Sequence, residues 1–356
     1  MRDSPPMEQR LAGLWYRERA GIPLLAPFAW VYGALMRARR RAYRSGVLRS
    51  ERIGAPVVVV GNLTVGGTGK TPLTIWLARE LSARGLRVGI VSRGYGGHAS
   101  GPHTVQPGSD WRQVGDEPLM LARRAPGLTM VARDRAAGAR ALVARGAQVI
   151  LADDGLQHLR LSRDCEIVVL DGARGLGNGS LLPAGPLREP LDALAAPDAV
   201  VLNGTPEHAS LATALGSPPL QSAGPPIGMR LRLQEAVPLA AGERPRPLRE
   251  FGAGPVHAVA GIGNPSRFFR ELRAQGIEVI EHPFPDHHPF RARELAFGDS
   301  LPVLMTEKDA VKCEAFASPG LWYVPVAAEF SEREASELLR RVLAKVGVGS
   351  EAGGCS

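Results

Sequence analysis

A short glycine-rich loop that ends in a lysine and a threonine has the residue types needed to hold phosphate groups. It lies in the segment PVVVVGNLTVGGTGKTP, residues 56–72, directly after four valines. An uncharged β-branched run predicts a buried strand of a parallel sheet, and the residues after the loop predict a helix. Glycines at such a junction let successive backbone N–H groups point at an anion. The loop therefore predicts a nucleotide site, with Lys70 at the β- and γ-phosphates and the Thr71 hydroxyl on Mg²⁺.

The loop departs from the usual phosphate-binding pattern at one position. The strict pattern has glycine where this chain has Thr64. An ordinary glycine-rich turn is the alternative interpretation, but the buried strand before the loop and the helix after it favour nucleotide binding. The residues expected to bind the nucleotide are Thr64, Val65, Gly66, Gly67, Thr68, Gly69, Lys70 and Thr71.

A pair of aspartates follows another buried run. In VILADDGLQH, residues 149–158, the predicted strand ends at Asp153 and Asp154. P-loop proteins hold Mg²⁺ with an aspartate at such a strand end, so we expect one of this pair to bind the metal together with Thr71. His158 either hydrogen-bonds to the pair or lies on the surface.

Two further segments carry side chains suited to proton transfer. Asp116 and Glu117 in GDEP precede a predicted helix, and on this pattern alone a role in capping that helix is favoured. The segment EVIEHPFPDHHPF, residues 278–290, contains His287 beside a second histidine and an aspartate. Its proline-rich spacing does not match a zinc template. These residues could suggest a metal site, but a histidine that is hydrogen-bonded to a carboxylate and acts in proton transfer is at least as good an interpretation.

Several polar side chains are candidates for contact with nucleotide or acceptor. Arg93 and Tyr95 follow the predicted strand 88–92, where they could contact either ligand. A tight turn without a ligand contact is the alternative interpretation of this loop. The proline-rich context of LPAGPLREP predicts that Arg188 and Glu189 are exposed, with a plain connector as the default interpretation. Lys308 is one of only four lysines among 43 cationic residues. A lysine in a chain that otherwise uses arginine indicates a position that needs the lysine side chain itself.

Composition sets the class of protein. Of the 356 residues, 44% are hydrophobic and 22% are charged, as in a folded soluble protein. The formal charge of +8 favours an anionic partner such as a nucleotide, a nucleic acid or anionic lipid. Three scattered cysteines support neither a disulfide framework nor a zinc site, which fits a reducing cytosol.

The N-terminal part of the chain differs from the rest. Residues 21–36 carry no charge, and five arginines follow between residues 37 and 44. The run is shorter than the roughly 20 residues of a membrane-spanning helix, and no signal-peptide cleavage site follows it. Its aromatic residues and the arginines favour peripheral or shallow association with anionic lipid head groups. An amphipathic helix packed on the protein's own core is the alternative.

Buried strands alternate with helices from residue 56 onward. This alternation predicts a P-loop NTPase-type parallel sheet with helices on both faces and ligands at the C-terminal ends of the strands. A change of composition after residue 204 and an alternating run at 229–233 indicate a linker before a second, smaller α/β unit. The expected divisions are residues 1–50 for a membrane-associated helix, 51–222 for the P-loop domain, 223–250 for a β linker, 251–345 for the smaller domain and 346–356 for a disordered tail.

Taken together, the motifs resemble those of the tetraacyldisaccharide 4′-kinases, the lipid A kinases of Gram-negative bacteria. The resemblance covers residues 15–346, and the threonine at position 64 is similar to that family's own variant of the loop. The motifs, in order, are VVVVGNLTVGGTGKTP, VSRGYGG, GDEP, ADDGLQHLRL, EIVVLDG, LPAGPLREP, AGIGNPSRFF, the DHH segment and VLMTEKDAVKC.

The resemblance implies transfer of the ATP γ-phosphate to the 4′-hydroxyl of tetraacyldisaccharide 1-phosphate, giving lipid IVA, with Mg²⁺ as cofactor. It implies two α/β/α domains joined by a two-stranded linker, with the active site between them. On this resemblance Lys70, Asp116 and His287 are catalytic: Asp116 is the base toward the sugar hydroxyl, and His287, or its neighbour His288, orients it or tunes its pKa.

The same resemblance sets the expected partners and location. The partners are ATP, an acylated glucosamine disaccharide lipid and an anionic membrane surface, with no nucleic acid. The expected location is the cytoplasmic face of the bacterial inner membrane. The 1-phosphate of the acceptor needs cations, for which Arg93, Arg188 and Lys308 are candidates.

Two other functions fit part of the pattern. A P-loop GTPase or metallochaperone-type switch would need a guanine-reading motif. Residues 306–309 resemble this motif, but they lie in the predicted second domain. A soluble small-molecule kinase or ligase would have no use for the N-terminal helix.

Overall fold

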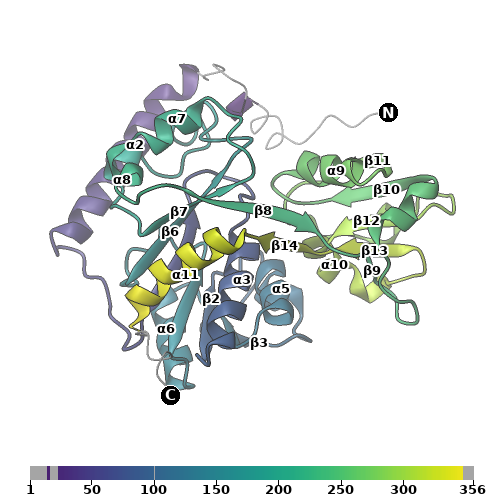
Figure 1. The fold of residues 1–356 in the computed structure, drawn as a ribbon, viewed down its shortest axis with the longest axis horizontal. Coiled ribbons are helices and arrows are strands. Elements are labelled where there is room, and N and C mark those ends of the chain that lie inside the picture. The colour runs from purple at the N-terminus through teal and green to yellow at the C-terminus, as the bar shows by residue number, and fades with distance from the viewer. Residues whose placement is uncertain (1–13, 17–22, 100, 348–356) are drawn as a thin grey trace.

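The computed structural model describes residues 14–16, 23–99 and 101–347, and its elements form two lobes (Figure 1). The larger lobe is built on a nine-stranded sheet of order β14-β8-β7-β6-β1-β5-β2-β4-β3. The six pairings that join β8, β7, β6, β1, β5, β2 and β4 are parallel, and the edge strands β14 and β3 are antiparallel to their neighbours. The strands are β1 (Val57–Asn62), β2 (Val88–Ser92), β3 (His103–Val105), β4 (Leu128–Val131), β5 (Val149–Asp153), β6 (Cys165–Asp171), β7 (Ala199–Asn203), β8 (Ile227–Leu233) and β14 (Val326–Glu329).

Helices cover both faces of this sheet because alternate residues of each central strand point to opposite sides. Val58 and Val60 of β1 share a core with α3 and α11, whereas Val57 and Val59 pack with α6. The predicted sheet with helices on both faces is therefore confirmed. The helices of this lobe are α2 (Ala26–Arg44), α3 (Lys70–Ala83), α4 (Trp111–Val114), α5 (Asp116–Arg124), α6 (Arg135–Ala144), α7 (Ser210–Leu215), α8 (Pro218–Gln221) and α11 (Glu332–Val346).

The smaller lobe holds a five-stranded sheet of order β11-β10-β12-β13-β9, parallel except at β9. Phe268, Phe269 and Leu272 of α9 pack on one face of this sheet, and α10 lies on the other. The elements are β9 (Val237–Pro238), β10 (Pro255–Ala260), α9 (Pro265–Ala274), β11 (Glu278–Pro283), β12 (Val303–Thr306), α10 (Glu307–Cys313) and β13 (Leu321–Val324).

The chain crosses between the lobes twice, outward in β8 and back in β14, which pair side by side (Figure 1). After β14 the chain adds α11 to the larger lobe, where Leu338 and Val342 are fully buried in its core. β14 and all of α11 except Val346 lie inside the range 251–345 that the sequence assigned to the smaller domain. A local pattern could not reveal this return, because an amphipathic helix does not encode which sheet it covers. Of the expected tail, Val346 closes α11, and residues 348–356 lie outside the described part of the chain.

The N-terminal helix lies on the flank of the larger lobe (Figure 1). A 3-10 turn, Pro23–Leu25, leads into α2, so the arginines predicted to follow the helix are part of it. The docked face holds Ala29, Gly33 and Arg40, which are buried. Away from the docked face an apolar stripe at helical spacing is exposed, made of Leu24 in the 3-10 turn and Phe28, Val31 and Leu35 in α2, and Trp30 is exposed as well. Within the described ranges, no helix is both long and apolar enough to cross a membrane.

Candidate active site

The phosphate loop lies between β1 and α3, as the sequence predicts. All six residues of β1 are buried. Gly66 and Gly69 have φ of 103° and 100°, values that favour glycine, and Gly69 precedes the first residue of α3. The side chain of Lys70 donates to Oδ1 of Asn62 at 3.1 Å, which holds the ammonium over the loop. The backbone therefore has the curl and the cation that a polyphosphate requires.

The proline-rich segment around residues 181–188 braces this loop. Thr64 forms an isolated β-bridge with Leu187, and the Val65 N–H donates to the carbonyl of Pro186 at 2.9 Å. Thr64 is absent from the positions of positive φ, so a side chain is tolerated where the strict pattern has glycine. The segment is therefore the structural support of the loop.

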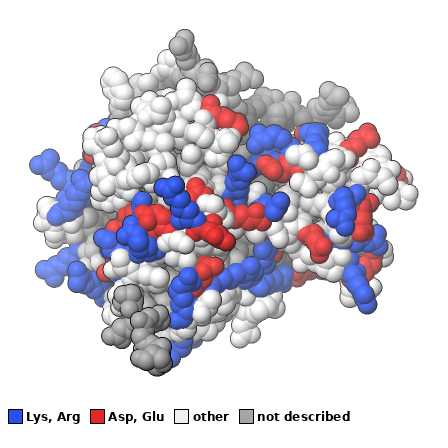
Figure 2. Space-filling model, viewed as in Figure 1, with Lys and Arg blue, Asp and Glu red and all other residues white. Residues whose placement is uncertain are grey.

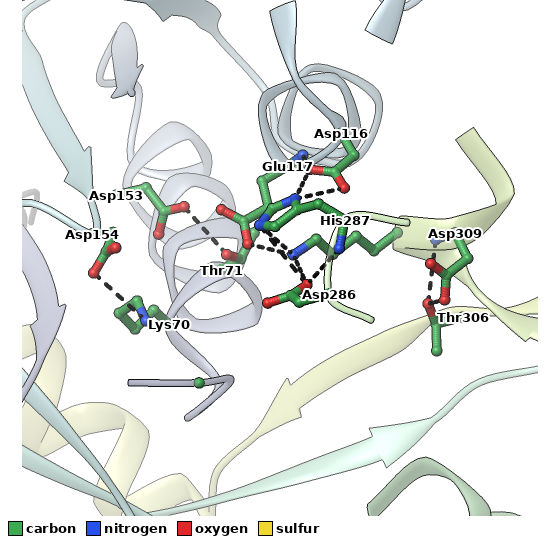
Figure 3. A network of polar contacts seen from close by, with 12 residues as sticks. Lys70, Thr71, Asp116, Glu117, Asp153, Asp154, Asp286, His287, Thr306 and Asp309 are labelled. Carbon is green, nitrogen blue, oxygen red and sulfur yellow. Dashed lines mark hydrogen bonds and ion pairs between the residues drawn. The ribbon is translucent and has the colours of Figure 1, made fainter. Parts of the chain in front are cut away.

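The two aspartates at the end of β5 differ in their partners. Asp153 accepts from Thr74 Oγ1 at 2.9 Å and from Thr71 Oγ1 at 3.2 Å. Asp154, with a φ of 49°, lies 3.6 Å from the ammonium of Lys70 and accepts from Arg188 at 2.9 Å. Asp153 is therefore next to the threonine that the sequence assigned to the metal, and Asp154 is part of an ion-pair cluster (Figure 3).

The pKa values of the two carboxyls move in opposite directions. Burial, with the charges of Glu117 and Asp154, raises the pKa of Asp153 to about 6. Burial also acts to raise the pKa of Asp154, but the cations Lys70 and Arg188 outweigh it and lower that pKa. The edge of β5 thus concentrates negative charge that a bound cation would relieve.

A contact between the two lobes joins Asp116 to His287. Asp116 is the first residue of α5 and is 3% exposed, and its Oδ2 and Oδ1 lie 2.9 Å and 3.0 Å from His287 Nδ1. His287 lies beyond β11 in the smaller lobe and has a φ of 60°. Such a conformation in a non-glycine residue costs energy and is found most often at functional sites. The structure therefore brings together the acid and the histidine that only the family resemblance had paired.

The surroundings of this pair shift the pKa values of its two members in opposite directions. Burial acts to raise the pKa of Asp116, but Lys308 and His287 lower it to about 2. Burial acts to lower the pKa of His287, and its hydrogen bond with Asp116 raises that pKa above its usual value. An ionised carboxylate only accepts hydrogen bonds, so Nδ1 of His287 carries a proton.

Lys308 crosses from α10 to α5 and completes the cluster. Its ammonium donates to Glu117 and to Asp286, each at 2.9 Å, and lies 3.4 Å from His287 Nε2. Burial opposes its charge, but Glu117 and Asp116 outweigh that effect and raise the pKa of Lys308. Carboxylates from both lobes therefore hold this lysine, and its contact with the acceptor phosphate stays a prediction.

Three other candidate residues lie elsewhere around the site. The ring of Tyr95 lies 4.7 Å from that of His287, and Arg93 is exposed at the end of β2. His158 is half-buried in a basic pocket of about 270 Å³, and burial lowers its pKa to about 4. The pocket is lined by Arg39, Arg133, Asp134, Arg135, Ala136, His158, Arg160 and Leu161.

The expectation that Glu189 is exposed was wrong. Glu189 is 1% exposed and accepts from Arg40 Nε at 2.7 Å, because α2 covers the segment that the sequence had placed on the surface. Arg188 is half-buried and bonded to Asp154. The histidines of this segment have separate partners, since His282 bonds to His257 and His288 bonds to Glu294.

Comparisons with known proteins give the family. The family of tetraacyldisaccharide-1-P 4′-kinases matches residues 22–344. The chain belongs to this kinase family. A tetraacyldisaccharide 4′-kinase of Alkalilimnicola ehrlichii is 51% identical over 90% of this chain and 92% of its own length, and one of Pseudomonas aeruginosa is 47% identical over 90% and 93%.

A solved structure agrees with the family assignment. The crystal structure of LpxK from Aquifex aeolicus in complex with ATP superposes with a TM-score of 0.71 at 27% identity. The match covers 91% of this chain and 98% of that one. The two-lobed fold described above is therefore the fold of a tetraacyldisaccharide-1-P 4′-kinase.

Sequence reasoning missed several members of this kinase's polar cluster. Asn62 holds Lys70, and Asp286 holds Lys308. Lys312 is fully buried, 2.8 Å from Asp309 and 3.7 Å from Asp116. The spacing of Lys308 and Lys312 on one helical face was the available signal, but their partners are distant in the sequence.

Proposed function

We propose that this protein transfers the γ-phosphate of ATP to the 4′-hydroxyl of tetraacyldisaccharide 1-phosphate, forming lipid IVA in lipid A biosynthesis. The observation that carries the proposal is the contact of Asp116 with His287 across the lobes, beside a phosphate loop. Family membership and the likeness to an ATP complex of LpxK support it.

The donor side is formed by the loop, Lys70 and the edge of β5. Lys70 and the backbone N–H groups of the loop would hold the β- and γ-phosphates. The donor set at β5 suits Mg²⁺, because Asp153 and the Thr71 hydroxyl are 3.2 Å apart and both are oxygen ligands. Bound there, Mg²⁺ would neutralise charge on the phosphates. Asp154 would orient the Lys70 ammonium from the opposite side, at 3.6 Å.

The acceptor side is formed by Asp116 and His287. Phosphoryl transfer asks the protein mainly to position the nucleophile and to stabilise charge. The Asp116 carboxylate, ionised at neutral pH, would accept the hydrogen bond of the sugar hydroxyl and orient it toward the phosphate. His287, bonded to that carboxylate through Nδ1, would hold it in place and share the proton as it leaves the hydroxyl.

The surface of the larger lobe is suited to an acylated, anionic acceptor. The exposed stripe Leu24, Phe28, Val31 and Leu35 on α2 would enter the head-group region of a bilayer, and we place the protein at the cytoplasmic face of the inner membrane. The basic pocket beside Arg39 of α2 offers cations for the acceptor's 1-phosphate. On the face shown in Figure 2, acidic and basic side chains mix along the junction of the lobes, so the positive charge is not spread as one continuous patch.

The direct test is phosphate transfer from radiolabelled ATP to purified tetraacyldisaccharide 1-phosphate in detergent micelles. The wild type should label the lipid at the 4′ position, and Asp116→Ala should abolish labelling while a fluorescent ATP analogue still binds. A pure, folded wild type that binds ATP and leaves this lipid unlabelled would refute the proposal.

A P-loop GTPase switch is not favoured. Its guanine-reading aspartate would be Asp309, but this residue is fully buried and accepts from Thr306 Oγ1 and from the Gly261 N–H. Both of these contacts use Oδ2, and the other oxygen, Oδ1, lies 2.8 Å from the ammonium of Lys312, so the carboxylate is enclosed within the smaller lobe and is not open to a base.

A further inference from the structure

A cationic side chain at the start of α9 also reaches from the smaller lobe to the larger one. Arg267, the third residue of α9, donates to Asn203 Oδ1 at 2.9 Å and lies 3.4 Å from Asp171 Oδ2. Asp171 and Asn203 are paired in register and are the last residues of β6 and β7. They are 3% and 1% exposed. The guanidinium therefore spans two buried strand ends of the other lobe.

The contacts of Arg267 continue into the phosphate loop by two routes. Asn203 Nδ2 donates to the carbonyl of Thr68 at 2.8 Å. Asp171 also pairs with Arg174, and Arg174 Nη2 donates to the carbonyl of Gly67 at 2.8 Å. Through these contacts the carbonyls of residues 67 and 68 in the phosphate loop are linked to α9 of the smaller lobe.

The turn before α9 connects the same helix to His287. The backbone of Gly263 lies against the phosphate loop, since a Cβ on it would be 3.0 Å from Gly66 Cα and 3.1 Å from Gly67 N. Two residues earlier, the carbonyl of Gly261 accepts from the His287 N–H at 3.3 Å. Residues 261–267 thus contact the nucleotide loop at one end and the histidine at the other.

The direction of the Arg267 side chain is fixed by its neighbours. Phe268 and Phe269 are 4% and 1% exposed and anchor α9 in the core of the smaller lobe. The next arginine on the helix, Arg270, is exposed. A two-point contact to an amide and a carboxylate uses the planar fork of arginine, which a lysine cannot reproduce.

We propose that Arg267 is a positioning residue for phosphoryl transfer: it fixes the turn 261–264 against the phosphate loop and thereby places His287 on Asp116. The inference rests on the proposed function for its catalytic consequence, but the placement of His287 is a property of the protein alone. Arg267 does not touch the reacting atoms, and its effect is carried by Asn203, Asp171 and the backbone of the turn.

The kinetic test compares Arg267→Gln and Arg267→Lys with the matched control Arg270→Gln on the same helix. Displacements of about 1 Å can cost roughly 100-fold in rate, so Arg267→Gln should lower kcat by about 10- to 100-fold. The dissociation constant of an ATP analogue should stay within about 3-fold, because Lys70 and the loop amides remain. Arg267→Lys should be intermediate, and Arg270→Gln should match the wild type. Unchanged kcat in Arg267→Gln, or an equal loss in Arg270→Gln, would overturn the proposal.

A spectroscopic readout separates positioning from simple stabilisation. We would titrate histidine ring signals by NMR in ¹³C-histidine-labelled protein, with His287→Asn to assign the resonance. In the wild type the pKa of His287 should lie above the ordinary value of about 6.5, and in Arg267→Gln it should move toward that value. A kcat loss with an unmoved His287 titration would show that Arg267 acts only on the loop and would refute the placement of His287. The titration needs no acceptor lipid, so it decides the matter even if the wild type proves unable to phosphorylate that lipid.

Discussion

His287 Nδ1 lies 2.9 Å from Oδ2 of Asp116, and this single contact joins a turn of the smaller lobe to the first residue of α5 in the larger one. The two residues are 171 positions apart in the sequence and lie in different lobes. The pair can therefore exist only while α5 and α10 are packed, as they are through Val311 and Leu119. Relative placement of the lobes is thus a condition for the chemistry proposed here.

The choice between adjacent histidines can be tested by parallel substitutions. His287→Asn should lower kcat by about 100- to 10,000-fold, the usual range for a general acid–base partner, with little change in KM for ATP. Asparagine tolerates the positive φ at this position, so the variant should fold. His288→Asn is the control, because His288 bonds to Glu294 at 3.1 Å and not to Asp116. Equal losses in the two variants would contradict the assignment.

The raised pKa of His287 predicts opposite pH trends in stability and in rate. Its folded-state pKa exceeds the unfolded value of about 6.5, so its stabilising effect is complete below that pH and is lost as pH rises through the folded pKa. The neutral form, with one proton on Nδ1, is the better proton acceptor, so kcat should rise over the same range. We would measure urea unfolding of wild type and His287→Asn at about pH 5.5 and 9, expecting the difference in free energy of unfolding to shrink at the higher pH. A difference that grows would contradict the sign.

The lowered pKa of Asp116 predicts a separate loss of stability in acid. Its unfolded pKa is about 3.9, so its contribution is present above that pH and is lost as pH falls toward about 2. Urea unfolding of wild type and Asp116→Asn between these pH values should converge toward the acid end. Curves that diverge in acid would show that Asp116 is not stabilised as an anion.

The two aspartates of β5 should respond differently to Mg²⁺. Asp153→Asn removes a charged oxygen next to Thr71, so the Mg²⁺ concentration for half-maximal rate should rise by about 10-fold or more. Asp154→Asn leaves that oxygen in place but removes the charged partner of Lys70 and leaves only its hydrogen bond to Asn62, so KM for ATP should change more than the Mg²⁺ dependence. Rates measured against Mg²⁺ at saturating ATP distinguish the two. An identical response would contradict separate roles.

Removing the apolar stripe of α2 should weaken membrane binding. We expect the serine variant of Leu24, Phe28, Val31 and Leu35 to sediment less with vesicles containing anionic lipid, since burying each large apolar side chain contributes up to about 1.5–3 kcal/mol. Ile280→Ser, which alters an exposed apolar residue of the smaller lobe, is the control. If the stripe variant sediments like the wild type, α2 does not anchor the protein.

The buried ion pair under α2 should matter far more than the exposed one beside it. Glu189→Gln leaves the Arg40 guanidinium buried without its carboxylate, which typically costs about 3–5 kcal/mol. Asp192→Asn breaks the ion pair with Arg37. The side chains of Asp192 and Arg37 are 66% and 51% exposed, so the loss should cost less than about 1 kcal/mol. Free energies of unfolding from urea titration test both. Similar costs for the two variants would contradict the difference in burial.

Local patterns predicted the parts of the site that are local in sequence. The β1 strand, the phosphate loop and the start of α3 form one continuous segment, and its period and glycines were sufficient. The strand end at Asp153 was predicted for the same reason. Contacts between distant segments were not accessible in this way. Pattern alone assigned Asp116 to helix capping, and the resemblance to a family was needed to pair it with His287.

The incorrect expectation for Glu189 has a plain physical cause. Glu189 was placed on the surface because proline-rich loops usually lie there, but α2, 149 residues earlier, covers it. The partners of Lys308 were equally inaccessible to local patterns, because Glu117, which accepts its hydrogen bond, is 191 residues away. A side chain's exposure depends on what packs over it, and a residue's own neighbours in the sequence do not contain that information.

The paired crossings β8 and β14 have a practical consequence for dissecting this protein. A fragment that stops near residue 250 would lose β14 and α11, leaving β8 as an unpaired edge and opening the core where Leu338 and Val342 are buried. The larger lobe is therefore completed by β14 and α11, which are synthesised after the smaller lobe. Residues up to Val346 must be made before the nucleotide-binding lobe can close, so a fragment for its expression has to include them.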